Sequence, residues 1–121
     1  MKILLVDDDA FLRDMYATKF TESKYVVDTA DSSSAALRKV EEGDFDVMLL
    51  DMIMPGMTGV ELIKIIHEQF PESKMKCIVL SNQGQESDIE EAESAGAIGY
   101  IVKAEMIPSE VVKRVEKLME K

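Results

Sequence analysis

Carboxylates, a hydroxyl and an amine follow four apolar runs of this chain. The residues that directly follow these runs are Asp7, Asp8 and Asp9, then Asp51, Ser81 and Lys103. A carboxylate can act as a nucleophile, and neighbouring carboxylates supply the oxygen ligands that divalent cations prefer. An amine and a hydroxyl can hold the oxygens of a transferring group. Together these residue types indicate phosphoryl transfer, provided that the fold brings them to one place.

The apolar runs alternate with segments of helical periodicity. Strands are expected at residues 2–6, 25–29, 46–50, 75–80 and 98–102. Helices are expected at residues 10–21, 34–42, 59–70 and 85–95, and from Pro108 through Leu118. Strand–helix units without hairpins predict a parallel sheet covered by helices on both faces. A chain of 121 residues is long enough for one such domain and too short for two.

Ligands of an open α/β sheet bind beyond the carboxyl ends of its strands. If the strand order is 2-1-3-4-5, then Asp7, Asp8 and Asp51 converge, and their mutual repulsion favours a bound cation such as magnesium. Asp51 is then the phosphoryl acceptor and needs no general base, because its carboxylate is already ionised. Lys103 and the metal are expected to hold two phosphoryl oxygens, and the Ser81 hydroxyl a third.

The segments that carry these residues resemble the receiver domains of response regulators in two-component signalling. The resemblance rests on residues 5–9, 49–59, 80–81 and 99–103, and it spans nearly the whole chain. It implies a flavodoxin-like three-layer α/β sandwich with the strand order 2-1-3-4-5. It also implies that residues 1–121 form a single receiver domain with no attached output domain.

The same resemblance implies a chemistry and a partner. A sensor histidine kinase or a phosphotransfer protein would donate a phosphoryl group to Asp51. Asp8, Asp51 and the backbone carbonyl of Ile53 would bind Mg²⁺ directly, and Asp7 would bind it largely through water. The domain would act on its own phosphoryl group only, and so would not be an enzyme with a separate substrate.

The resemblance further implies a switch. Ser81 would move toward the phosphoryl group and the ring of Tyr100 would turn inward, which would alter the face formed by the fourth helix, the fifth strand and the fifth helix. A downstream protein would read this face. Two alternatives stay open: Tyr100 is a static packing residue, or the domain serves as a phosphorelay intermediate or phosphate sink.

Three departures from the usual pattern of these domains bear on the chemistry. Ala104 stands after Lys103 where proline is usual, so the cis peptide bond common there is not expected. Asn82 follows Ser81 and would narrow the approach to Asp51. Ile53 and Gln83 occupy positions that tune dephosphorylation, and the apolar Ile53 predicts slow loss of the phosphoryl group because it cannot orient a water molecule.

Composition excludes several other functions. The net charge of −10, from 24 acidic and 14 basic residues, disfavours nucleic acid and anionic membranes as partners. A single cysteine, Cys77, forms no internal disulfide and is expected to pack in the core, as in a cytoplasmic protein.

Particular residues argue against three rival functions. A phosphohydrolase with an aspartate nucleophile would need a second aspartate where Ile53 stands. In a flavin-binding module, the acidic residues 7–9 would repel the phosphate of the flavin. An interaction module that is never phosphorylated would not need the complete set of phosphoryl-transfer residues described above.

Overall fold

The computed structural model describes residues 1–120 and shows five strands alternating with helices. The strands are β1 (Lys2–Val6), β2 (Val26–Ala30), β3 (Val47–Leu50), β4 (Lys76–Ser81) and β5 (Gly99–Val102). The helices are α1 (Ala10–Glu22), α2 (Ser33–Glu42), α3 (Gly59–Gln69), α4 (Glu86–Ala95) and α5 (Pro108–Met119), with a 3-10 turn, η1 (Lys103–Glu105), after β5.

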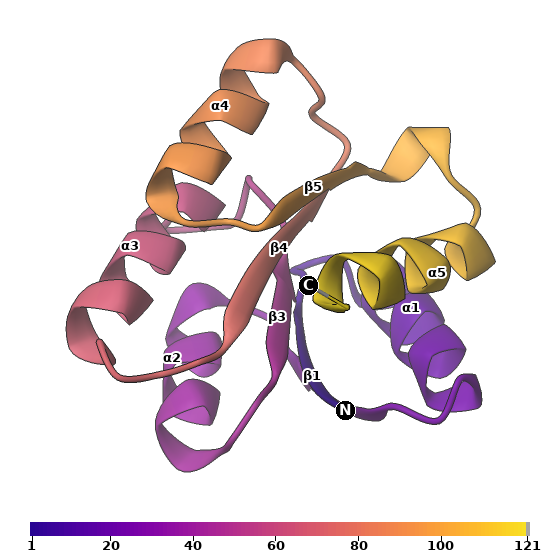
Figure 1. The fold of residues 1–121 in the computed structure, drawn as a ribbon, viewed down its shortest axis with the longest axis horizontal. Helices are drawn as coiled ribbons and strands as arrows, with labels where there is room; N and C mark the ends of the chain where they lie inside the picture. Colours follow the sequence, from indigo (N-terminus) through magenta and orange to yellow (C-terminus); the bar gives the residue numbers. More distant parts are fainter. Residues whose placement is uncertain (121) are drawn as a thin grey trace.

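All neighbouring strands pair in parallel, in the order β2-β1-β3-β4-β5. Figure 1 shows α2, α3 and α4 on one face of the sheet and α1 and α5 on the other. The expected flavodoxin-like sandwich and its strand order are therefore confirmed. Each element end matches the prediction or differs from it by a single residue, which is the usual scatter at frayed ends. The sequence pattern did not predict η1, and Ser81 is the last residue of β4 rather than the residue after it.

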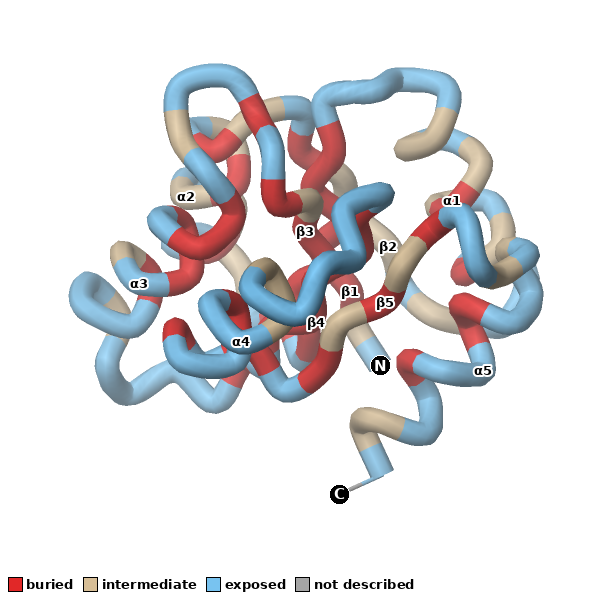
Figure 2. The backbone as a smooth tube through the Cα atoms, turned by 90° about the horizontal axis from the view of Figure 1, so that it is seen from above, coloured by how far each residue is buried: buried red, intermediate tan, exposed pale blue. Residues whose placement is uncertain are grey.

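Two hydrophobic clusters hold the helices to the sheet. Alternate residues of β1 illustrate the arrangement, since Leu4 and Val6 pack in the cluster with α2, α3 and α4, whereas Ile3 and Leu5 pack with α1 and α5. In Figure 2 the buried residues gather in the central strands and on the inward sides of the helices. Both faces of each central strand are buried, which explains why the strands appear in the sequence as continuous apolar runs.

Local signals fix the start of α3 close to the end of β3. Thr58 and Glu61 form a capping box, in which each side chain accepts a hydrogen bond from the other residue's backbone amide. Gly59 follows, and a Cβ at this position would overlap the backbone oxygen of Asp51. The absence of a side chain at Gly59 therefore lets the helix begin directly beside Asp51.

Candidate functional site

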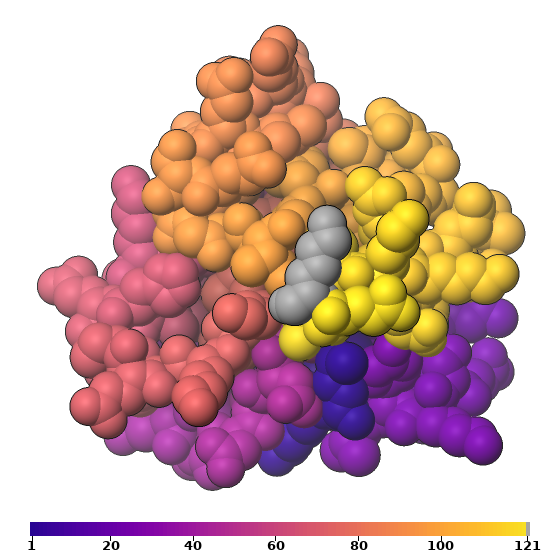
Figure 3. Space-filling model, in the orientation of Figure 1, coloured from indigo at the N-terminus to yellow at the C-terminus, as the bar shows by residue number. Residues whose placement is uncertain are grey.

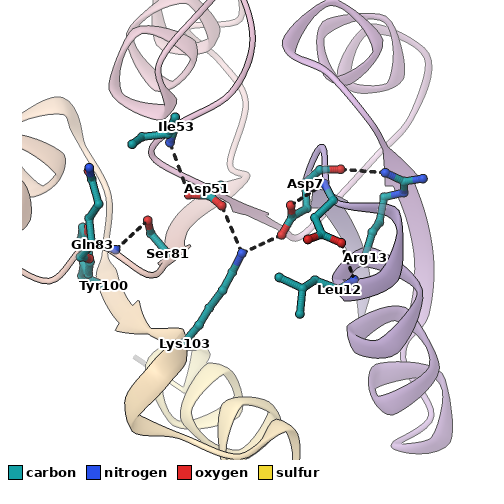
Figure 4. Close-up of polar contacts among 10 residues, drawn as sticks. Asp7, Leu12, Arg13, Asp51, Ile53, Ser81, Gln83, Tyr100 and Lys103 are labelled. Carbon is teal, nitrogen blue, oxygen red and sulfur yellow. Dashed lines mark hydrogen bonds and ion pairs between the residues drawn. The ribbon is translucent and has the colours of Figure 1, made fainter.

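The predicted site residues lie together at the carboxyl end of the sheet. Val6 of β1 pairs with Leu50 of β3, so the residues that follow them, Asp7 and Asp51, stand at the same level on adjacent strands. Ser81 ends β4, and Lys103 follows β5. Figure 4 shows the side chains of all four residues converging from these strands. The sequence prediction that strand ends assemble these groups agrees with this geometry.

Lys103 joins the two carboxylates. Its Nζ donates hydrogen bonds to Oδ2 of Asp7 at 2.7 Å and to Oδ2 of Asp51 at 3.1 Å. The side chains of Lys103 and Asp7 are only 5% and 4% exposed, whereas that of Asp51 is 16% exposed and so is the one open to a reactant. Burial alone would lower the pKa of Lys103, but the hydrogen bond to Asp7 and the charges of both carboxylates raise it above its ordinary value. Lys103 is therefore a fixed cation at neutral pH.

The second oxygen of Asp51 is held by the following loop. The backbone amide of Ile53 donates to Oδ1 of Asp51 at 3.3 Å. Ile53 itself is 59% exposed and is therefore not part of the core. Two different groups thus orient the Asp51 carboxylate, one at each oxygen.

Asp7 is fixed by contacts that the sequence pattern did not predict. The Arg13 guanidinium donates to the backbone carbonyl of Asp7 at 2.8 Å, and the Asp9 backbone amide donates to its Oδ1 at 2.9 Å. Asp9 also caps α1, as expected, by accepting from the Leu12 amide at 3.1 Å. Tyr16, one turn after Arg13, is buried close to this cluster, and burial raises the pKa of its hydroxyl above the ordinary value. The one sequence feature that could have indicated a joint role for Arg13 and Tyr16 is their spacing of three residues, which places them on the same face of α1.

The expected cluster of three carboxylates is only partly formed. Within residues 1–120, no three acidic, histidine or cysteine side chains lie in an arrangement able to hold a metal ion. Lys103 occupies the position between Asp7 and Asp51, and Asp8 is exposed. The set still suits magnesium chemically, because Asp8 and Asp51 present carboxylate oxygens at the ends of adjacent strands and magnesium needs only one or two such ligands besides water.

Ser81 and Tyr100 are linked through the loop after β4. The Ser81 hydroxyl accepts a hydrogen bond from the Gln83 amide at 3.2 Å, and the Tyr100 hydroxyl donates to the Gln83 carbonyl at 2.6 Å. Burial is the main cause of the raised pKa of Tyr100, so its hydroxyl remains a donor at neutral pH. Asn82, which stands between Ser81 and Gln83 in this loop, is exposed. In residues 1–120 no peptide bond is cis, and the bond between Lys103 and Ala104 is accordingly trans.

Two further observations concern parts of the chain outside the site. Cys77 is buried in the core, as predicted, and burial raises the pKa of its thiol to about 12. The thiol is therefore protonated and unreactive at neutral pH. Of the helices described in residues 1–120, none has both the length and the apolar character needed to span a membrane.

Comparison with known proteins decides the family. Residues 3–116 match the response regulator receiver domain family. The chain belongs to this family. Chemotaxis protein CheY of Thermotoga maritima is 37% identical over 118 residues, a match that covers 97% of this chain and 96% of that protein. The transcriptional regulatory protein ResD of Bacillus subtilis is 36% identical over 98% of this chain, but the chain spans only about half of ResD, 48% of its length.

Solved structures agree with this assignment. A CheY-like receiver domain from Methanospirillum hungatei superimposes with a TM-score of 0.88 at 28% identity, over 98% of this chain and 93% of the other. Membership of the receiver family is thus supported by sequence and by structure.

Proposed function

We propose that the chain is a receiver that takes up a phosphoryl group on Asp51 in a magnesium-dependent reaction and signals through the resulting change in its surface. The observation that carries the proposal is the position of the Lys103 ammonium, which bridges Asp51 and Asp7 at 3.1 and 2.7 Å beside a partly exposed acceptor carboxylate. Phosphoryl transfer depends mainly on positioning and on neutralisation of charge, and this arrangement supplies both.

The proposed reaction uses few groups. An oxygen of Asp51 forms the new bond to phosphorus while the bond from phosphorus to the donor nitrogen of a phosphohistidine breaks. Lys103 neutralises one phosphoryl oxygen, and the Ser81 hydroxyl donates to another after leaving the Gln83 amide. Asp8, Asp51 and the Ile53 carbonyl would hold Mg²⁺, with Asp7 acting through water, and the metal would neutralise further charge on the phosphoryl group.

The partners belong to the same proposal. A sensor histidine kinase or a phosphotransfer protein donates the group, and a downstream protein reads the face of α4, β5 and α5. A role as relay intermediate or phosphate sink is the second form of this proposal. The chain acts only on its own phosphoryl group, in the cytoplasm, and its charge of −10 disfavours contact with nucleic acid or anionic membranes.

The proposal is tested by incubation with acetyl phosphate, with and without MgCl₂, followed by intact-mass measurement. We expect the mass of one phosphoryl group to be added only when magnesium is present. Peptide mapping after reduction of the acyl phosphate with borohydride should locate the group on Asp51. Unmodified protein under both conditions, or modification at another residue, would contradict the proposal.

Magnesium is expected to raise the melting temperature of the unphosphorylated protein. A ligand at ten times its Kd adds about 1.4 kcal/mol to the free energy of unfolding, which corresponds to roughly 5–6 °C for a domain of this size. The shift should disappear in Asp8→Ala. Asp14→Ala removes the same charge from an exposed position on α1 and should keep the shift. An unchanged melting temperature for the wild type in millimolar magnesium would show that the proposed metal site is wrong.

Loss of the phosphoryl group is expected to be slow and to be accelerated in Ile53→Asn. Hydrolysis requires a water molecule in line with the phosphorus, and the exposed Ile53 side chain can neither accept from such a water nor donate to it. An amide at this position should speed phosphate loss about tenfold, equivalent to about 1.4 kcal/mol in the barrier. Decay is followed by mass spectrometry after the donor is removed. Ile53→Val should remain slow, and an asparagine variant no faster than wild type would exclude control by this side chain.

A further inference from the structure

A hollow opens at the amino-terminal end of the sheet, remote from the proposed acceptor site. Its volume is about 870 Å³, and its walls are the chain on either side of the α2–β3 connection and the α3–β4 connection. These segments are the adjoining magenta and salmon regions at the lower left of Figure 3. Because β3 and β4 begin here and carry Asp51 and Ser81 at their other ends, the hollow is separate from that site. Its volume lies within the range of about 300–1,000 Å³ that is usual for small-molecule sites.

The floor of the hollow is an edge of the hydrophobic core, where Phe70 is the one partly exposed apolar residue among the residues that line it. Val40, Phe45 and Met75 belong to the cluster between the sheet and α2–α4, and the half-buried Phe70 packs against that cluster. The Phe45 ring already attracts a cation, since Nζ of Lys2 lies 4.8 Å from its centroid. An apolar group placed in the hollow would therefore gain hydrophobic contact. A cationic group beside it would find an aromatic ring that attracts positive charge.

The rim of the hollow is acidic. Four lining side chains carry carboxylates, Glu41, Asp44, Asp46 and Glu72, against one lining amine, Lys74. All four acids are exposed, and only Asp46 has a carboxylate oxygen engaged by the backbone, through the Lys2 amide at 2.7 Å. Even with Lys2 counted beside Lys74, the rim has excess negative charge, which attracts cations and repels anions.

We propose that this hollow binds a small amphipathic organic cation, a compact apolar or aromatic body that carries an ammonium or amidinium group. The apolar body would lie on Phe45, Phe70 and Met75, and the cationic group would face the carboxylates of Asp44 and Glu72. The acidic rim disfavours nucleotides and fatty acids. The apolar floor offers a bare metal ion no oxygen ligands. Neither anions nor bare metal ions therefore match both the acidic rim and the apolar floor.

The probe pair 2-phenylethylamine and phenylacetate tests the proposal, since both carry one aromatic ring and their charges are opposite. Each is titrated into ¹⁵N-labelled protein while amide chemical shifts are recorded. We expect 2-phenylethylamine to produce saturable shifts concentrated in residues 40–46 and 69–75, and phenylacetate to produce none there. Equal shifts from both probes, or no saturable shift from the amine, would overturn the proposal.

Charge-reversal variants separate local recognition from the overall charge of the protein. Asp44→Lys combined with Glu72→Lys should raise the Kd for 2-phenylethylamine at least tenfold, because it places two cations on the rim. The control, Glu90→Lys combined with Glu93→Lys, makes the same change in net charge at exposed positions of α4 and should leave the Kd within twofold of wild type. Similar weakening by both pairs would show that the amine responds only to net charge and would refute a specific site.

Discussion

Asp51→Asn is expected to abolish covalent phosphorylation while the domain stays folded. The amide has nearly the same volume as the carboxylate but lacks a charged oxygen able to attack phosphorus. Its carbonyl can still accept from Lys103, which lies 3.1 Å from Oδ2 in the wild type, so the position of Lys103 should be kept. Intact-mass measurement with acetyl phosphate and magnesium should therefore show no added phosphoryl group, and circular dichroism should match the wild type.

A matched control keeps this result specific. Asp14→Asn makes the same chemical change at an exposed position of α1, and it should be phosphorylated at the wild-type rate. If Asp51→Asn gained a phosphoryl group as fast as the wild type, another residue would be the acceptor and the proposed site would be wrong. If the variant lost its folded spectrum, the borohydride mapping of the wild type would still decide which residue accepts the group.

The fold could be predicted from the sequence because the central strands are buried on both faces. Such strands appear as short continuous apolar runs, and residues 2–6 and 47–50 are of this kind. The order of the strands in the sheet could not be predicted from the apolar runs. Apolar periodicity identifies strands but does not say which ones pair, so the order came from the resemblance to receivers and was then confirmed by the pairing of β1 with both β2 and β3.

The pattern of the residues predicted the site where its side chains end a strand or directly follow one. Asp7, Asp51, Ser81 and Lys103 were found in this way, because the carboxyl ends of parallel strands share one edge. The direct pairing of Lys103 with buried Asp7 was not predicted, since it depends on the path of η1 after β5. Arg13 was missed because it lies on α1 and reaches the Asp7 carbonyl only when the helix packs on the sheet.

Lys103→Met should lower the free energy of unfolding by about 3 kcal/mol, because removing one partner of a buried ion pair leaves the other charge uncompensated. Methionine fills a similar volume but leaves Asp7, with a side chain only 4% exposed, without its cation and facing Asp51. Phosphorylation by acetyl phosphate should slow about 100-fold, because one donor to the phosphoryl oxygens is lost. Urea unfolding in metal-free buffer measures the first effect, and mass spectrometry the second.

The sign of the pH dependence follows from the raised pKa of Lys103. A base whose folded-state pKa lies above its ordinary value, 10.5 here, contributes stability that is complete below that value and is lost as the pH rises through the folded-state pKa. The difference between wild type and Lys103→Met should therefore be constant near neutral pH and shrink as the pH rises into the alkaline range.

Two further variants distinguish a buried charge effect from simple loss of packing. Lys39→Met breaks the exposed ion pair with Asp28, whose side chains are 39% and 41% exposed, and should cost less than about 1 kcal/mol. Asp7→Asn added to Lys103→Met should restore part of the lost stability, because it removes the unpaired buried carboxylate that causes the loss. If the double variant were no more stable than Lys103→Met, the cost would come from packing around residue 103. The ion pair between Lys103 and Asp7 would then not be what stabilises the site.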